Sequence, residues 1–237
     1  MKTTYVGTDL EAMSFAENYH RWILSELRPY LGKSLVEVGA GTGSFSELLL
    51  ECRPTSLILV EPSEMVSKLR ERISTVKTGA TLRILDSSFR EVSDEIAGAK
   101  PDSVIYVNVL EHIEDDSAEL AAVFDALAPG GRVFIFVPAH PWLYGAFDAS
   151  VGHFRRYRRS ELEQRTRAAG FEILVLKYFD FVGIAPWWVK YRLLRSAKLE
   201  PKAVELYDRW AVPVTRALES AFTPPTGKNL LMIGEKP

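Results

Sequence analysis

The chain has 237 residues, 47% of them hydrophobic, which suits a single α/β domain with a full core and some insertions. Its formal net charge is −2, so no overall positive field is available to recruit nucleic acid. A single cysteine, Cys52, excludes an intramolecular disulfide, and no apolar run approaches the roughly 20 residues of a membrane span; both features favour a cytoplasmic protein.

The first expected element is an amphipathic helix near the N-terminus. Its apolar side chains recur at helical spacing, with Tyr19, Trp22, Ile23 and Leu27 on one face. We expect this aromatic face to pack against the core. Residues 1–33 are therefore predicted to form a helical cap on the domain.

A glycine-rich loop follows the first predicted strand. The apolar run of residues 35–38 leads directly into Gly39, Gly41 and Gly43, and a helical pattern begins soon afterwards. Glycines at alternate positions let the backbone turn sharply and approach a ligand that a β-carbon would push away. A strand, a glycine loop and a helix in this order form the unit in which α/β sheets bind nucleoside-containing ligands.

The loop departs from the dinucleotide-binding fingerprint at two positions. Ser44 stands where the Gly-x-Gly-x-x-Gly pattern requires its third glycine. Glu37 precedes the first glycine by two residues, and a carboxylate aimed at the loop repels a pyrophosphate but suits a cationic ligand. These two residues disfavour a nicotinamide-dependent oxidoreductase, which is kept as an alternative.

Two further apolar runs predict the second and third strands. The runs at residues 57–60 and 81–85 lead into the polar pairs Glu61-Pro62 and Asp86-Ser87. Glu61 lies about 20 residues beyond the glycines, a spacing that places it to bind ribose hydroxyls. NAD shares that ribose with other nucleoside ligands, so Glu61 alone does not identify the ligand.

The remaining strands follow at regular intervals. A fourth strand is expected from Asp102 to His112 and contains the beginning of the string NVLEHIED. The fifth ends at Pro138, after a Pro-Gly-Gly turn at residues 129–131. Apolar runs at residues 171–179 and 229–235 predict the sixth and seventh strands.

The motifs between residues 34 and 138 together resemble those of the class I S-adenosylmethionine (SAM) methyltransferases, in the same order along the chain. The resemblance implies a Rossmann-like seven-stranded α/β sheet with its last strand antiparallel. It implies SAM as cofactor and S-adenosylhomocysteine (SAH) as product. The cofactor-binding residues that it implies are Tyr19, Glu37, Gly39, Ala40, Gly41, Thr42, Gly43, Glu61, Pro62, Asp86, Ser87, Asn108, Val109 and Leu110.

A long polar and aromatic loop follows the fifth strand, at residues 138–159. Ligands of open α/β sheets bind beyond the carboxyl ends of the strands, and this loop leaves such an end.

A hydroxyl acceptor usually needs a general base, most often histidine or a carboxylate. The catalytic candidates are His112, His140, Tyr144 and His153. The substrate-side candidates are Asp148, Arg155, Arg156, Tyr157, Trp187 and Trp188. The alternative is a loop that locks the fold, with its arginines paired to Asp148 or to helix carboxylates.

An aromatic and basic segment separates strands six and seven. We divide the single domain, residues 1–237, into a cofactor-binding core at 34–179 plus 228–237 and a helical insertion at 180–227. The insertion is predicted to be a lid over the substrate. Plain packing, a homodimer contact and contact with a membrane surface are the alternatives.

The sequence therefore predicts a SAM-dependent methyltransferase that acts on oxygen or nitrogen by in-line displacement. Its acceptor is expected to be a small molecule or a lipid-linked intermediate, and nucleic acid is disfavoured. No histidine and cysteine cluster with ligand spacing is present, so no metal is expected. A SAM-binding domain without catalysis, serving as an interaction module, is a further alternative.

Overall fold

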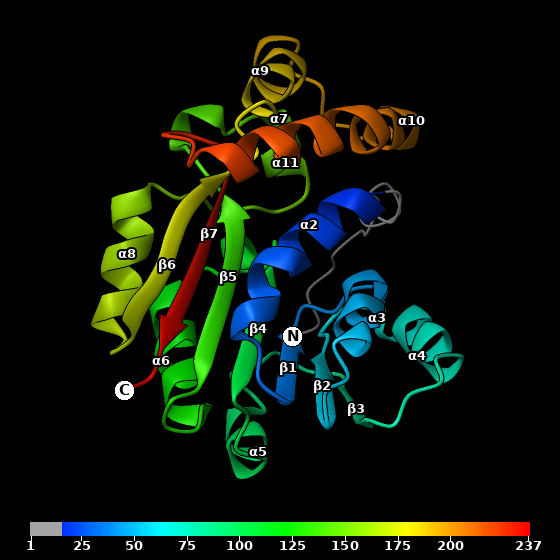
Figure 1. Ribbon diagram of the computed structural model, residues 1–237, viewed down its shortest axis with the longest axis vertical. Coiled ribbons are helices and arrows are strands. Elements are labelled where there is room, and N and C mark those ends of the chain that lie inside the picture. Colours follow the sequence, from blue (N-terminus) through cyan, green and yellow to red (C-terminus); the bar gives the residue numbers. More distant parts are fainter. Residues whose placement is uncertain (1–15) are drawn as a thin grey trace.

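Seven strands form one mixed sheet in the structure, a computed structural model that describes residues 16–237 (Figure 1). Their order is β3-β2-β1-β4-β5-β7-β6, and β7 runs antiparallel to both of its neighbours. The strands are β1 Ser34–Val38, β2 Ser56–Val60, β3 Thr81–Leu85, β4 Ser103–Val107, β5 Arg132–Pro138, β6 Glu172–Phe179 and β7 Asn229–Glu235. The predicted Rossmann-like sheet with an antiparallel last strand is confirmed.

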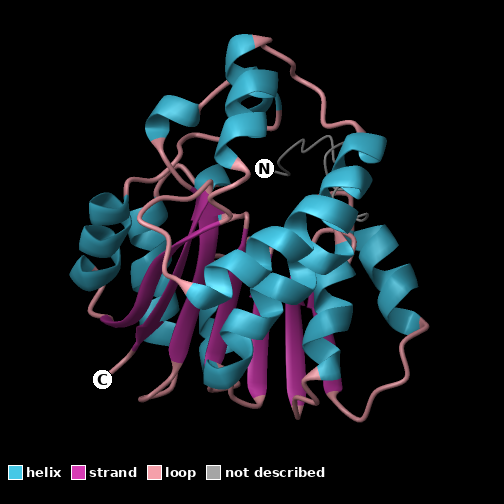
Figure 2. Cartoon of the chain, turned by 45° about the horizontal axis from the view of Figure 1, so that its top comes forward, coloured by secondary structure: helices cyan, strands magenta, loops and turns pink. Residues whose placement is uncertain are grey.

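The sheet is buried on both faces, because helices cover each of them. Successive side chains along a strand point to opposite faces and therefore belong to two separate cores. Leu35 of β1 belongs to the first core, whereas Val36 and Val38 belong to the second. The first core is covered by α2 Glu17–Leu27, α3 Ser44–Glu51 and α4 Val66–Ser74. The second is covered by α5 Ser93–Gly98, α6 Asp116–Ala126 and α8 Arg159–Ala168. Figure 2 shows the strands enclosed between these helices.

The helix expected near the N-terminus is α2, which packs Trp22 and Ile23 into the first core. A distant side chain caps its first turn: Asp208 accepts hydrogen bonds from the backbone N–H groups of Asn18, at 3.0 Å, and Tyr19, at 2.8 Å. A carboxylate there satisfies N–H groups that have no partner within the helix. Residues 1–15 of the predicted N-terminal cap lie outside the described residues.

The fourth strand is shorter than the sequence predicts. β4 ends at Val107, and residues Leu110–His112 form a 3₁₀ helix, η2, instead of continuing the strand. The reason is Asn108, whose φ of 55° lies in the left-handed region and turns the chain out of the sheet. This turn brings the NVLEHIED string to the carboxyl edge of the sheet.

Helices fill the segment between β6 and β7 and lie across the carboxyl ends of the parallel strands (Figure 1). They are α9 Ile184–Trp187, η4 Trp188–Leu193, α10 Pro201–Leu206, η5 Tyr207–Ala211 and α11 Val212–Ala221. Polar contacts fasten them to the end of β6. The Tyr207 hydroxyl donates to Asp180 Oδ1 at 2.6 Å, and the Phe181 N–H donates to Glu219 Oε1 at 2.9 Å. The division of the chain at residues 180 and 228 stays a prediction.

The strand order reverses between β1 and β4, and such a switch point opens a crevice beyond the carboxyl ends of the strands. On one side of it lies the glycine loop between β1 and α3. On the other side lies the chain between β5 and α8, which forms η3 Pro141–Leu143 and α7 Ala146–Ser150. The fold thus brings both loops singled out in the sequence to one edge of the sheet.

Candidate functional site

One pocket opens at this edge and is bordered by both loops. The glycine loop supplies one wall, and η2 with the loop after α7 supplies the opposite wall. Eleven of the residues predicted for the site line it: Tyr19, Glu37, Gly39, Ala40, Gly41, Thr42, Asn108, His112, His153, Arg156 and Trp187. The structure therefore gathers predicted cofactor-side and acceptor-side residues in one space.

The loop conformation explains why glycines are needed there. Gly39 and Gly43 have φ of 69° and 86°, values that residues with a β-carbon rarely adopt. A β-carbon on Gly39 would lie 2.5 Å from Val109 Cγ2, closer than two carbon atoms can approach. The chain after β4 therefore packs directly against the loop, and Val109 supports the wall of the pocket from behind.

Glu37 places a buried carboxyl group in the pocket wall. It is 4% exposed and accepts a hydrogen bond of 2.5 Å from the Ser46 hydroxyl. Burial raises the pKa of Glu37 to about 8, against the smaller opposing effect of the Ser46 hydrogen bond. A cationic ligand in the pocket would favour the ionised carboxylate, so the site suits a positively charged ligand.

Glu61 braces the glycine loop by hydrogen bonds to backbone N–H groups. Its Oε2 accepts from the Gly41 N–H at 2.7 Å, and its Oε1 accepts from the Ser63 N–H at 2.9 Å. The side chain is buried and is not among the pocket-lining residues, so contact with a ribose stays a prediction. The other predicted cofactor residues that do not line the pocket are Gly43, Pro62, Asp86, Ser87, Val109 and Leu110.

In the chain between β5 and α8, Asp148 is the centre of a buried polar network. It is fully buried, and its Oδ1 contacts His153 Nδ1 at 2.9 Å and accepts from Arg156 Nε at 2.8 Å. Its Oδ2 accepts from the Gly145 N–H at 2.9 Å. Burial opposes ionisation of Asp148, but these hydrogen bonds prevail and hold its pKa below the usual value. Asp148 thus fixes the orientation of His153 and Arg156 against the pocket.

Arg155 and Tyr157 contact Asp116 of α6 and lie outside the pocket lining. Tyr157 is fully buried, and its hydroxyl donates to Asp116 Oδ2 at 2.7 Å. Arg155 Nη1 lies 2.7 Å from the same carboxylate oxygen. These two contacts match the fold-locking alternative, in which the loop pairs with a helix carboxylate.

His140, Tyr144 and Trp188 also lie outside the pocket lining. His140 stacks on Tyr178 and contacts Thr226 Oγ1 through its Nε2 at 2.8 Å, beside a separate surface hollow. The Tyr144 hydroxyl donates to the backbone carbonyl of His153 at 2.8 Å, a supporting contact behind the histidine. Trp188 is 40% exposed, whereas its neighbour Trp187 faces the pocket under the Arg156 guanidinium.

Sequence reasoning did not select Glu111, which also lines the pocket. Its side chain is fully buried, and neither carboxylate oxygen accepts a hydrogen bond from the described residues. Burial raises the pKa of Glu111 to about 7. The position of Glu111 beside His112 in the NVLEHIED string could have pointed to it. Only the folded structure shows that its buried carboxylate lacks a hydrogen bond from the described residues.

Comparison with known proteins agrees with this geometry. A family model described as a methyltransferase domain matches residues 15–176. Ubiquinone biosynthesis O-methyltransferase of Idiomarina loihiensis is 29% identical over 165 residues, which cover 63% of this chain and 66% of that protein. Malonyl-[acyl-carrier protein] O-methyltransferase of Chlorobium phaeovibrioides is 28% identical over 174 residues, covering 70% and 65%. The chain thus spans just under two thirds of the length of these two relatives.

Solved structures share the fold. A SAM-dependent methyltransferase from Archaeoglobus fulgidus superposes with a TM-score of 0.59 at 17% identity, covering 92% of this chain and 94% of that one. The cyclopropane synthase MmaA2 from Mycobacterium tuberculosis gives a TM-score of 0.60 at 12% identity, covering 90% and 82%. At these identities the likeness concerns the fold alone.

Proposed function

Because the chain belongs to the SAM-dependent methyltransferase family, we propose that it transfers the methyl group of SAM to an oxygen atom of a small-molecule or lipid-linked acceptor. The observation that carries the proposal is that one and the same pocket borders both the glycine loop and the wall formed by Glu111, His112 and His153. The two curated relatives described above are O-methyltransferases, which favours oxygen over nitrogen.

The glycine-loop side of the pocket fits SAM by its shape and charge. Gly39, Ala40 and Gly41 line the pocket, and the glycines allow the left-handed turns with which the loop presents its backbone, so a nucleoside can lie against that backbone. Glu37 offers a buried carboxylate to a ligand that carries an ammonium and a sulfonium. SAM supplies a methyl group that is already activated, so the chain's main task is to align the acceptor with it.

The acceptor would enter beside Trp187 and meet the wall that carries His153. Asp148 and Arg156 hold this wall rigid, and rigid positioning of the attacking oxygen contributes much of the rate in a displacement reaction. Transfer to a hydroxyl oxygen also requires that the hydroxyl proton leaves.

The test is a transfer assay with ¹³C-methyl-labelled SAM and a panel of hydroxyl and amine acceptors, read by NMR. We expect a labelled O-methyl product and an equal amount of SAH. A panel in which only amines become labelled would contradict methylation at oxygen. The Gly39→Ala variant tests whether turnover depends on the glycine loop, because the added β-carbon perturbs the conformation of that loop.

A second property of the fold favours a lipid-linked acceptor. Nine of the twelve large hydrophobic side chains that are exposed among residues 16–237 lie on the helices between β6 and β7 or at their end. They are Trp188, Val189, Leu193, Leu194, Leu206, Trp210, Val214, Leu218 and Phe222. Exposed apolar side chains in such number mark an interaction surface.

The charge of these helices favours an anionic bilayer as the partner. Residues 184–198 contain four basic residues and no acid, although the whole chain is slightly acidic. Of the acids further along the segment, Asp208 caps α2 and Glu219 binds the backbone of Phe181. Glu200 and Glu205 are exposed, and Glu200 lies 3.9 Å from Lys190. None of the described helices has the length and apolarity needed to cross a bilayer. We therefore propose that this surface lies on an anionic membrane, where apolar side chains and basic residues act together.

Co-sedimentation with vesicles tests this part of the proposal. We expect the chain to bind vesicles that contain phosphatidylglycerol and to bind pure phosphatidylcholine vesicles weakly. Leu194→Glu should reduce vesicle binding several-fold. Leu174→Glu is the control, because Leu174 is an exposed leucine of the edge strand β6, outside this surface, and its replacement should not reduce binding. Equal reduction by both variants, or dimer formation without vesicle binding, would overturn the membrane assignment.

A further inference from the structure

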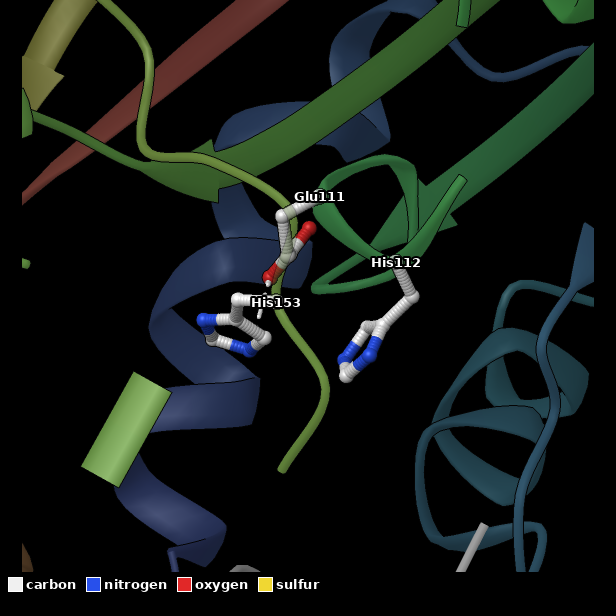
Figure 3. A group of neighbouring side chains, drawn as sticks. All are labelled: Glu111, His112 and His153. Atoms are coloured by element: carbon white, nitrogen blue, oxygen red, sulfur yellow. Dashed lines mark ion pairs between the residues drawn. The ribbon is translucent and has the colours of Figure 1, made fainter. Parts of the chain in front are cut away.

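Three side chains of ligand type converge on one wall of the pocket (Figure 3). Glu111 and His112 belong to η2, and His153 belongs to the loop that follows α7, about 40 residues later. One donor atom from each of the three side chains lies within 4.8 Å of the other two. Within this set, His153 Nε2 is 3.9 Å from Glu111 Oε1. The sequence does not show this cluster, because its members are not at ligand spacing along the chain.

Among the described residues, the Glu111 carboxylate has only a loose ion pair, with His153 Nε2 at 3.9 Å from its Oε1. It is fully buried, it borders the pocket, and neither of its oxygens accepts a hydrogen bond from the described residues. Arg156, which also lines the pocket, is hydrogen-bonded to Asp148. A buried carboxylate without a hydrogen bond is costly, and a cation bound between it and the two histidines would compensate it.

Both histidines are held as metal-binding histidines usually are. Such residues fix the ring by a hydrogen bond from the second nitrogen to a carboxylate or a backbone carbonyl. His153 contacts Asp148 Oδ1 through Nδ1 at 2.9 Å, and Asp148 is itself bound by Arg156 and Gly145. The His112 ring is hydrogen-bonded to the backbone of Gly152. Each ring is therefore oriented by a contact behind it, while both rings border the pocket.

We propose that Glu111, His112 and His153 bind one divalent transition-metal cation, of the class of Zn²⁺, Co²⁺ or Fe²⁺. Two imidazoles and one carboxylate suit these ions better than Mg²⁺ or Ca²⁺, which prefer oxygen ligands alone. Three protein ligands leave open positions, as in catalytic rather than structural sites. Because all three side chains line the pocket, an acceptor bound there could fill such a position.

The chemical role rests on the proposed function. A hydroxyl oxygen of the acceptor takes an open position on the cation, which lowers the pKa of that hydroxyl as it does for bound water. The hydroxyl proton leaves to bulk water. The oxygen then forms the new C–O bond with the methyl carbon, while the C–S bond of SAM breaks and its electron pair stays on sulfur. The acceptor class is thus a hydroxyl compound whose oxygen can ligate a divalent cation.

Cobalt binding tests the site without any methyl transfer. The purified full chain is titrated with Co²⁺ in the absence of SAM, and visible absorption and the metal content after gel filtration are measured. We expect one Co²⁺ per chain and at least tenfold weaker binding in Glu111→Gln and in His153→Ala. His140→Gln is the matched control, because this histidine lies outside the pocket, and it should bind Co²⁺ as the parent chain does.

SAH calorimetry on each variant shows that the fold and the cofactor side persist, so loss of Co²⁺ cannot be ascribed to unfolding. Failure of the parent chain to bind Co²⁺, or equal binding by the parent and Glu111→Gln, would overturn the metal site and leave the proposed methyl transfer standing. The metal site would also be overturned if methyl transfer is lost in Glu111→Gln and His153→Ala but is unaffected by EDTA in the parent chain. The two side chains would then act as proton acceptors. Absence of SAH binding would instead defeat the proposed function.

Discussion

Replacement of Glu37 by glutamine should stabilise the ligand-free chain, and the gain should grow with pH. Burial raises the pKa of Glu37 from 4.5 to about 8 in the folded state. The folded chain therefore holds a proton that the unfolded chain releases, so Glu37 costs stability as pH rises between these two values. One pKa unit corresponds to about 1.4 kcal/mol, so the cost is about 1.4 kcal/mol at pH 5.5 and about 4 kcal/mol at pH 8.

Glutamine carries no charge at either pH and can keep the contact with the Ser46 hydroxyl. The free energy of unfolding of Glu37→Gln, relative to the parent, should therefore rise by about 3 kcal/mol between pH 5.5 and pH 8. Urea unfolding at the two pH values measures it. Saturating SAH should reduce the stability gain of Glu37→Gln over the parent at pH 8, because the cationic amino group of SAH stabilises the ionised Glu37 carboxylate of the parent. A gain that is the same at both pH values would refute the argument, because Glu37 would then not change its protonation on folding in this range.

Three other substitutions test single contacts. Gly39→Ala should weaken SAH binding at least tenfold in calorimetry, because its β-carbon would meet Val109 and its φ is left-handed; unchanged affinity would mean that the loop does not border the cofactor. Tyr157→Phe removes the donor to buried Asp116 and should lower the free energy of unfolding by about 1–3 kcal/mol in urea titrations, while SAH affinity stays the same; weaker SAH binding with unchanged stability would contradict the fold-locking role. Asp208→Ala uncaps α2 and should cost about 1 kcal/mol in the same titrations, whereas no change would show that water replaces the carboxylate.

Local patterns along the chain were enough to predict the sheet and the glycine loop. Strands such as β2 and β7 are continuous apolar runs, because both faces of the sheet are covered, and their ends are marked by turn residues. The three glycines of the loop stand at positive φ, so their spacing reports a backbone conformation directly. The family resemblance extended these patterns to the antiparallel seventh strand, which periodicity alone does not show.

Contacts between distant parts of the chain could not be predicted in this way. Asp208 caps a helix 190 positions earlier, and nothing in its neighbouring sequence indicates that partner. The end of β4 depends on the left-handed conformation of Asn108, which apolar periodicity does not reveal. Glu111 looked like part of a motif, and only the fold shows that no described residue satisfies its carboxylate.

Titration calorimetry of the full chain with SAH and, separately, with NADH tests the central claim most directly. We predict saturable heat with SAH at one molecule per chain and none with NADH. In Glu61→Ala, SAH binding should be weaker by about 1–3 kcal/mol, because the Gly41 N–H of the glycine loop loses the Glu61 carboxylate that accepts its hydrogen bond. Saturable heat with NADH and none with SAH would contradict the methyltransferase account and favour an oxidoreductase.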